Sequence, residues 1–372
     1  MLKKAVNKFN LIKWLALIFA GWQLVLLLLA YVSQFLIKLR PDYASEFGGR
    51  ANFDGMHYLT IAARGYQGFQ QAFFPFYPYL IRFFSKFIFH NYFISGLFIS
   101  NLSILIALFL FYKLTRLDFS EKCAQTAILF LLLFPVSFFF GSVYTESLFL
   151  TLVVGSFYAA RKKQWLLAGL LGGVASATRL VGIFLFPALL VEWWQYKQQS
   201  KKQRILNLCW VFLSTGGLLF YMWYLKRTMG DPLYFVHVQS MFGANRTGGK
   251  LILLYQVFWR YLKMILTTKM NVLYFTVWLE LLTSIMFLLL SIFTYYKMRL
   301  SYFVFMILAY LTPTLTGTFL SMPRFMLVLF PGFIILAIFS EKHSWFKIIY
   351  PVVSGILLVI STILFIRGYF VA

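Results

Sequence analysis

Residues 53–78 read FDGMHYLTIAARGYQGFQQAFFPFYP and follow the first long apolar run of the chain. This stretch carries Asp54, His57 and Arg64 in a protein in which only 12% of the residues are charged. A carboxylate in or beside a lipid bilayer is costly unless it faces water, a partner or a substrate. Asp54 is therefore the first candidate for a chemical role in this chain.

The composition around this stretch is that of a membrane protein. The chain has 372 residues, of which 61% are hydrophobic and 21% aromatic, and apolar runs long enough to cross a bilayer as helices, about 20 residues each, recur along its length. We predict an all-α polytopic integral membrane protein that forms a single domain over residues 1–372. The eleven predicted spans are 14–37, 94–112, 123–139, 146–160, 165–178, 180–195, 206–225, 272–296, 300–318, 323–340 and 347–367. The two short runs within 165–195 also fit one broken helix or a re-entrant pair.

The first span follows four lysines, Lys3, Lys4, Lys8 and Lys13. Because its apolar run is longer than that of a signal peptide, we interpret it as a retained anchor. The two cysteines, Cys123 and Cys209, fall at predicted cytoplasmic helix ends, where a disulfide or a cysteine metal site is not expected.

The distribution of positive charge predicts an orientation. With the N-terminus inside, the inner segments hold eighteen of the 34 lysines and arginines, whereas the short outer connections hold only Arg179, Arg324 and Arg367. Such an excess of inner cations is the usual rule for membrane proteins. We therefore expect a multi-pass protein of the cytoplasmic membrane whose chemistry lies on the outer face.

Two long outer segments, 38–93 and 226–271, hold the remaining thirteen cations. The basic side chains either snorkel at the interface or attract anionic headgroups or a lipid-linked phosphate, and both interpretations remain open. Phe, Tyr and Trp are frequent in both segments, which predicts helices lying in the interface plane. The net charge of +24 follows mostly from topology and does not indicate a nucleic-acid partner.

The first outer segment contains the best candidate for a general base. If residues 53–63 are helical, Asp54, His57 and Tyr58 share one face, at positions i, i+3 and i+4. Such a carboxylate can remove a proton from a hydroxyl while an anomeric carbon with a phosphate leaving group is attacked. The alternative is that Asp54 only caps the following helix.

Three further charged residues are candidates for substrate binding. Glu146 could bind a sugar hydroxyl or pair with Arg179 or Arg324, or it could simply favour a helix N-terminus that Thr145 or Ser142 caps. Arg179 and Arg324 each offer a planar fork that suits phosphate, although each could instead snorkel.

Several familiar motifs are absent from the sequence. There is no Walker A loop, no GxGxxG loop, no His/Glu metal motif and no Asp-x-Asp pair, so no cofactor is expected and a dependence on metal stays open. Glu280 lies inside a predicted span and therefore needs a partner or a polar cavity.

Four motifs in order resemble the PIG-V-type mannosyltransferases, whose eukaryotic member adds the second mannose to GPI anchors. They are F-D-x-x-H-Y-L-x-I-A-x-x-G-Y at 53–66 with A-F-F-P-x-Y-P at 72–78, F-P-x-S at 134–137 through Y-x-E-S at 144–147, A-T-R-x-x-G at 177–182, and P-R-F at 323–325 with Pro331. The family usually has Trp before the Asp, where this chain has Phe53.

The resemblance implies a GT-C fold and an inverting glycosyltransferase that uses a polyprenyl-phosphate-linked sugar, usually mannose. It implies that Asp54 is the base, with no metal needed for donor binding. We expect His57, Tyr58, Arg64, Glu146, Arg179 and Arg324 to bind the donor or other substrate. The partners would be the lipid-linked donor, the bilayer, and a glycolipid, glycan or protein acceptor; the compact chain suggests a bacterial enzyme, for which a GPI acceptor is implausible.

Two alternatives compete with an enzyme. A transporter or flippase of lipid-linked sugars would use the same basic surface but needs a polar path across the membrane, and the sequence offers few intramembrane charges and no matching broken helices in its two halves. The second alternative is a non-catalytic membrane scaffold.

Overall fold

The computed structural model of the chain describes residues 2–40, 49–196, 200–242 and 251–371. Among the basic residues used to predict topology, Lys197, Arg246 and Lys250 lie outside the described residues, as do the side chains of Lys3, Lys4 and Lys8. Residues 41–48 of the first outer segment and 243–250 of the second also lie outside them.

Every regular element in these described ranges is helical. The α-helices, joined by short 3₁₀ turns, are α1 (Leu2–Leu36), α2 (Asp54–Arg64), α3 (Phe76–Ser85), α4 (Tyr92–Thr115), α5 (Glu121–Leu132), α6 (Glu146–Arg161), α7 (Trp165–Thr178), α8 (Leu185–Gln195), α9 (Lys201–Phe212), α10 (Gly216–Met229), α11 (Tyr234–His237), α12 (Leu254–Thr267), α13 (Val272–Lys297), α14 (Leu300–Thr314), α15 (Met322–Met326), α16 (Phe330–Lys342) and α17 (Phe346–Ile366).

Each of the eleven predicted spans contains helix, and the chain is a multi-pass membrane protein. By length and composition, five of the described helical stretches can cross a bilayer on their own, and they are Asn10–Leu36, Tyr92–Thr115, Lys201–Met229, Val272–Lys297 and Phe346–Ile366. Shorter apolar helices, among them α7 and α14, pack between them. The number of spans therefore stays a prediction.

Two predicted spans are shorter than expected because the chain breaks near a proline. The helix expected over 123–139 ends at Leu132, and the chain passes Pro135 into a 3₁₀ turn, η3 (Ser137–Gly141). The helix expected over 323–340 divides into α15 and α16, with Pro331 in the first turn of α16. Proline fixes φ and has no N–H, so it suits a first helical turn but interrupts a helix interior.

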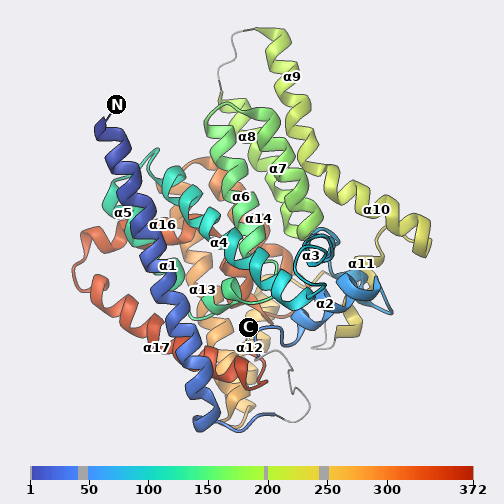
Figure 1. Cartoon of the computed structure of the whole chain (residues 1–372), viewed down its shortest axis with the longest axis vertical. Coiled ribbons are helices and arrows are strands. Elements are labelled where there is room, and N and C mark those ends of the chain that lie inside the picture. The colour runs from blue at the N-terminus through green and yellow to red at the C-terminus, as the bar shows by residue number, and fades with distance from the viewer. Residues whose placement is uncertain (1, 41–48, 197–199, 243–250, 372) are drawn as a thin grey trace.

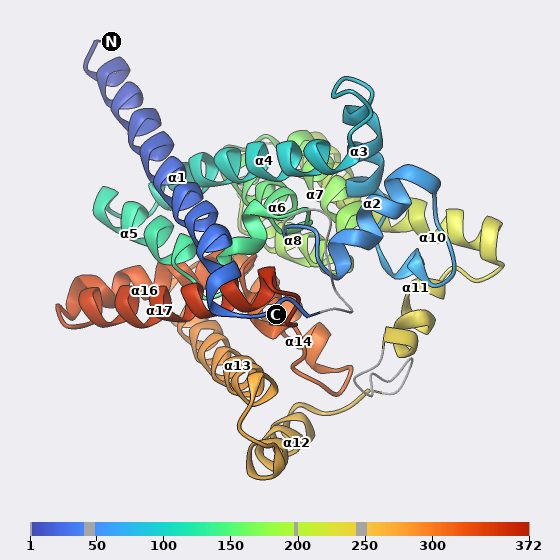
Figure 2. The ribbon, with the colours of Figure 1, turned by 60° about the horizontal axis from the view of Figure 1, so that its bottom comes forward.

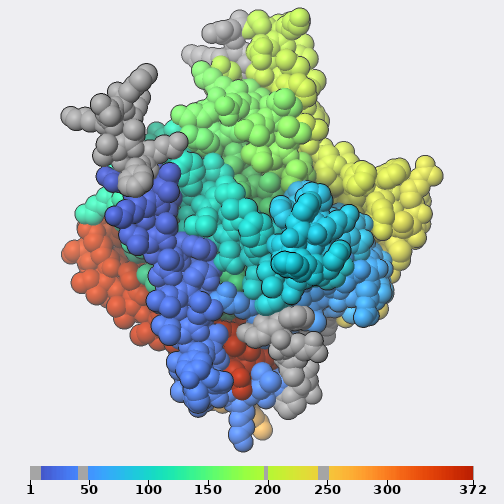
Figure 3. Space-filling view, in the orientation of Figure 1, coloured from blue at the N-terminus to red at the C-terminus, as the bar shows by residue number. Residues whose placement is uncertain are grey.

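Helix α1 lies on the outside of the bundle, beside α4 and α17 (Figures 1 and 3). Many of its leucines are exposed, including Leu17, Leu27 and Leu28. An apolar helix that is mostly exposed in the isolated chain is suited to contact with lipid.

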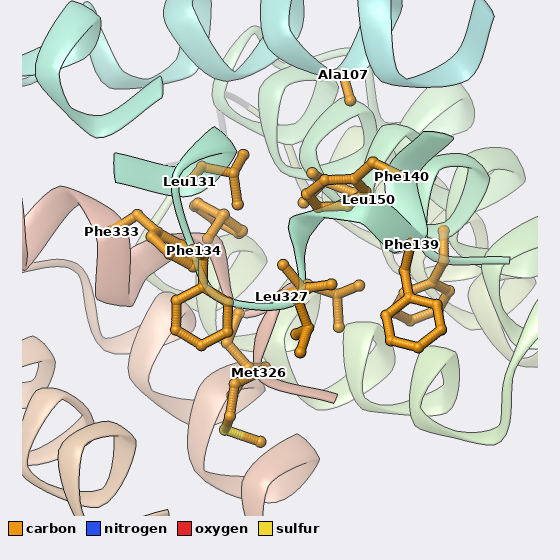
Figure 4. Packing of buried hydrophobic residues seen from close by; sticks show 14 of the residues in the cluster. Ala107, Leu131, Phe134, Phe139, Phe140, Leu150, Met326, Leu327 and Phe333 are labelled. Carbon is orange, nitrogen blue, oxygen red and sulfur yellow. The ribbon is translucent and has the colours of Figure 1, made fainter. Parts of the chain in front are cut away.

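The core holds in place two irregular segments that border the site. Phe134, Phe139 and Phe140, from the chain between α5 and α6, pack with Met326 and Leu327 at the end of α15 (Figure 4). All five side chains are nearly inaccessible to solvent. Because interiors are densely packed, the short helix that carries Arg324 has little freedom to move.

The predicted inner connections meet at one end of the bundle. Arg161 binds Asp118 through two hydrogen bonds of 2.5 and 2.7 Å, and Arg299 binds Glu192 at 2.6 Å. Arg161 ends α6 and Glu146 begins it, so the two ends of this helix lie about 22 Å apart at 1.5 Å per residue. The Arg161–Asp118 pair and the Glu146 ion pairs therefore lie at opposite ends of α6.

Helices form in both of the long segments for which interfacial helices were predicted, and their place at a membrane surface stays a prediction. Helices α2 and α3 form in the first, and α11 and the amphipathic α12 form in the second. Figure 2 shows α12 projecting below α13, away from the main bundle.

Candidate functional site

Asp54 is held in place by an unusual backbone conformation at the preceding residue. Phe53 has φ of +53° and ψ of −116°, a region that a non-glycine residue enters only when its surroundings enforce it. Asn52 donates to the carbonyl of Phe365 at 2.7 Å and accepts on its own carbonyl from the Tyr144 hydroxyl at 2.6 Å. These contacts fix the chain directly before α2.

Asp54 forms an ion pair across the fold with Arg324. Its Oδ2 accepts from Arg324 Nη1 at 2.6 Å, and the two side chains are 24% and 11% exposed. Asp54 is the first residue of α2 and Phe53 occupies the N-cap position, so the structure does not support a capping role for this carboxylate. Arg324 lies in α15, which begins after Ser321 in a left-handed conformation.

Glu146 extends the ion pair into a chain of four charges. Its Oε1 accepts from Arg179 Nη1 at 2.6 Å and lies 3.4 Å from Arg324 Nε. The order is therefore Asp54, Arg324, Glu146 and Arg179, with the signs alternating. Glu146 pairs with both arginines that the sequence offered as partners.

The second carboxylate oxygen of Glu146 is buried and accepts no hydrogen bond from the described residues. The side chain is only 1% exposed, and within the described part of the chain its Oε2 has no hydrogen-bond partner. Thr145, at the N-cap of α6, makes no side-chain capping bond. Leaving a buried charged oxygen without a donor costs free energy, so such an atom in a native fold calls for an explanation.

Aromatic rings surround the two arginines. The Arg324 guanidinium lies over Phe139, Tyr144 and Phe325 at 5.5 to 5.6 Å from the ring centroids. Arg179 lies over Phe149 and Phe325 at 5.7 and 5.2 Å. Cation–π contacts orient a guanidinium while leaving its in-plane N–H groups available for oxygen ligands.

His57 and Tyr58 lie beside the charges but face different surroundings. The His57 ring stacks on Phe73 with centroids 4.8 Å apart, and burial lowers its pKa against the opposing effect of Asp54. The Tyr58 ring is buried edge-on against Tyr77 and Phe73. Burial, followed by the nearby negative charge of Asp54, raises the pKa of Tyr58, so this hydroxyl stays protonated.

Arg64 is not brought to the charge cluster. It is exposed in the last turn of α2, ten residues and about 15 Å along the helix axis from Asp54. Its predicted role in donor binding therefore has no support from proximity to Arg324.

Two polar residues that border the site, the buried Asn52 and the half-buried Arg50, were not singled out as candidates from the sequence. Asn52 is 2% exposed and precedes the strained Phe53, and Arg50 donates at 3.3 Å to the carbonyl of Gly141 and to Gln23. The only signal in the sequence was their position next to Asp54. Among the described residues no group of three or more His, Cys, Asp or Glu is placed to hold a metal ion, and metal dependence stays open.

A family model described as dolichyl-phosphate-mannose-protein mannosyltransferase matches residues 72–224. The matched range is less than half of the chain; it contains Glu146 and Arg179 but neither Asp54 nor Arg324. No curated protein matches the chain.

The chain is similar in structure to ArnT from Cupriavidus metallidurans, solved with undecaprenyl phosphate, with a TM-score of 0.52 and 15% identity over 87% of this chain and 60% of that one. It is also similar to the Archaeoglobus fulgidus oligosaccharyltransferase, with a TM-score of 0.45 and 12% identity over 94% of this chain and 53% of that one. The chain therefore spans little more than half the length of these proteins.

The similarity to ArnT identifies the fold of the chain. The chain has the all-helical fold of the GT-C superfamily of membrane glycosyltransferases, as the sequence predicted. The narrower PIG-V type stays a prediction, since the matching family model describes protein mannosyltransferases.

Proposed function

We propose that this protein is an inverting glycosyltransferase that moves a sugar from a polyprenyl-phosphate donor to an acceptor hydroxyl. The observation that carries the proposal is the Asp54–Arg324 ion pair, with Glu146 and Arg179 beside it, in a GT-C fold. A carboxylate base and two arginines within one cluster are the groups that this reaction needs. ArnT, a protein with the same fold, was solved with undecaprenyl phosphate bound.

Asp54 is the proposed base. Arg324 at 2.6 Å favours the charged form of the carboxylate, which is the form that accepts a proton. As Asp54 takes the proton of the acceptor hydroxyl, the hydroxyl oxygen attacks the anomeric carbon from the face opposite the phosphate. The bond from that carbon to the phosphate oxygen breaks, and the electron pair leaves on polyprenyl phosphate. A β-linked donor thus gives an α-linked product.

The arginines are proposed to bind the leaving phosphate. Arg324 offers a planar fork, so its remaining guanidinium N–H groups can donate to a phosphate oxygen while Nη1 holds Asp54 and Nε faces Glu146. Arg179 would neutralise further negative charge as it develops on the leaving group. We assign Glu146 Oε2, the buried oxygen that accepts no hydrogen bond in the described chain, to a hydroxyl of the donor sugar.

The finer parts of the proposal come from sequence. The inner excess of lysine and arginine supports a cytoplasmic membrane protein with its N-terminus inside and its site on the outer face. The PIG-V-like motifs support mannose as the sugar, and the short predicted cytoplasmic loops support a bacterial member of that type. His57 and Tyr58 would shape the sugar site through their ring contacts.

This function can be tested by incubating the purified protein in liposomes with radiolabelled polyprenyl-phosphate sugars. We expect label to appear in a new glycosidic bond, with mannose the best sugar and with inverted anomeric configuration in the product. Label that only crosses the bilayer on its original lipid would instead indicate a flippase. Retention of configuration would contradict direct attack by an acceptor that Asp54 activates.

A further inference from the structure

A second polar site lies next to the charge cluster. A cavity of about 850 Å³ is bounded by α12, the start of α13, the chain that follows α14, and the C-terminal segment. This volume is within the range of small-molecule sites. None of the four charged residues of the cluster lines it.

Cations line this cavity from two segments. Arg260 and Lys263 come from α12, and Arg40 comes from the chain after α1. Arg260 reaches across to donate to the carbonyl of Gly317 at 3.0 Å. Gly317 has φ of +95°, and a Cβ there would lie 2.7 Å from the Arg260 guanidinium, so glycine allows this crossing.

The cavity also contains a carboxylate and hydroxyl groups. Glu280 is 4% exposed and accepts hydrogen bonds from the Tyr261 hydroxyl and from the backbone N–H of Ser321, the latter at 3.2 Å. Thr276 and Thr318 line the same space. Cations together with a carboxylate and hydroxyls suit a ligand that carries both a phosphate and free hydroxyls.

The cavity wall contacts residues next to the charge cluster at two points. Phe370 lies in the cavity wall and packs edge-on against Phe53, with ring centroids 5.2 Å apart. Phe53 directly precedes Asp54. Ser321, which Glu280 holds, precedes Arg324 by three residues. The wall of the cavity is therefore continuous with the segments that carry Asp54 and Arg324.

The helix that supplies two of the cations also carries an exposed apolar row. Tyr255, Trp259, Leu262 and Leu266 are all exposed at helical spacing along α12, and Lys263 lies over the Trp259 ring at 5.3 Å. A basic amphipathic helix of this kind suits the surface of a membrane. A ligand that enters beside α12 can thus come from the bilayer.

We infer that this cavity is the acceptor site and that the acceptor is an anionic lipid whose phosphate headgroup carries free hydroxyls. Arg260 and Lys263 bind the phosphate, and Glu280 accepts a hydrogen bond from a hydroxyl. The assignment to an acceptor rests on the proposed transferase function, whereas the binding of such a lipid can be measured without turnover.

Binding of short-chain phosphatidylglycerol to the purified full chain tests the inference, with soluble glycerol 3-phosphate as the second probe. Lys263→Gln should weaken lipid binding about fivefold, and Arg260→Gln with Lys263→Gln about 30-fold, which is the usual effect of one and two cations near an anionic headgroup. The matched controls are the single variant Lys269→Gln and the double variant Arg227→Gln with Lys269→Gln, because neither residue lines the cavity. Both control variants should bind the lipid as tightly as the wild type does.

Four outcomes decide the matter. Loss of lipid binding only in the Lys263 and Arg260 variants, with binding of the polyprenyl-phosphate donor unchanged, supports the acceptor site. Wild-type lipid affinity in those variants overturns the acceptor site. Variants that lose binding of the donor instead of the lipid also overturn it. Glycerol 3-phosphate binding as tightly as the lipid shows that the site takes a soluble phosphate and overturns the lipid assignment. Because these are binding measurements, they stay decisive even if no sugar transfer is found.

Discussion

At the scale of single residues, the buried charges are the most sensitive part of the molecule. Glu146 is 1% exposed and has Arg179 at 2.6 Å and Arg324 at 3.4 Å. Removing one partner of a buried ion pair is strongly destabilising, because the remaining charge stays buried without compensation.

We therefore expect Arg179→Gln to lower the free energy of unfolding by about 3 kcal/mol. Adding Glu146→Gln should recover a large part of that loss, because the buried charge, left with only its longer 3.4 Å contact to Arg324, is then gone. Thermal-shift measurements of unfolding in detergent, made on the two single variants and the double variant, would give the coupling free energy between Arg179 and Glu146. Additive losses would show that the two side chains do not interact as described.

His57 predicts a dependence of stability on pH. Burial lowers its pKa below the ordinary value of 6.5, so the unfolded chain takes up a proton before the folded chain does as the pH falls. Stability should therefore decline below about pH 6.5 and level off once the pH has passed the pKa of the folded state.

The His57→Phe variant keeps a ring on Phe73 but removes the titrating group. Its melting temperature should fall less than that of the wild type between pH 7 and pH 5. Equal slopes for the two proteins would mean that His57 does not contribute to the acid sensitivity.

At the scale of elements, close helix contacts place the segments that carry the arginines. Helix α10 crosses α7 so closely that a Cβ on Gly217 would lie 2.0 Å from the carbonyl oxygen of Gly173 and 2.6 Å from the Ala177 nitrogen. Backbone atoms cannot yield as a side-chain tip can. Arg179 follows directly after α7.

Gly217→Ala should accordingly destabilise the fold by about 1 to 3 kcal/mol, the usual cost of overpacking, and should displace the end of α7. Gly21→Ala is the matched control, because nothing lies within 4 Å of a Cβ there and alanine favours a helix. The two melting temperatures should move in opposite directions. A Gly217→Ala protein as stable as the wild type would show that the helices cross less tightly.

The sequence was enough to predict most of the elements but few of the contacts between them. Apolar run length and aromatic spacing predicted helices in every expected span, because those signals are local. The break after Leu132 and the division at Pro331 do have a local signal in the two prolines, but apolar run length alone continues across both. The Asp54–Arg324 pair joins residues 270 positions apart, and spacing along the chain could offer both residues as candidates but could not pair them.

The cavity beside Glu280 shows the same limit. Glu280 was expected to need a partner, yet Tyr261 and Ser321 come from different segments of the chain. The positive φ of Phe53 also had no signal in the sequence, since this conformation is imposed by contacts that involve Asn52, Phe365 and Phe370. Arg64 was proposed from its place in a motif, and the fold leaves it exposed at the far end of α2.

At the scale of the whole molecule, two charged groups lie at opposite ends of the bundle. The Asp118–Arg161 and Glu192–Arg299 pairs mark the predicted inner end, and the Asp54–Arg324 pair marks the predicted outer end. From the positive-inside rule we expect the first end to face the cytoplasm.

Cysteine labelling in intact cells would test this orientation in a background lacking Cys209, which is exposed. Met56→Cys is suitable because Met56 is 42% exposed in α2, and Lys202→Cys marks the exposed start of α9. A membrane-impermeant maleimide should label the first variant directly and the second only after permeabilisation. The reverse pattern would place the site in the cytoplasm.

The central claim is that Asp54 is the base that activates the acceptor. Asp54→Asn keeps the size of the side chain and removes its basicity, so single-turnover transfer from polyprenyl-phosphate mannose should fall by at least about 100-fold, within the range for loss of a general base. Donor binding and the melting temperature serve as the controls for folding, and Asp54→Glu should keep part of the rate. Wild-type transfer by a folded Asp54→Asn protein would contradict the claim.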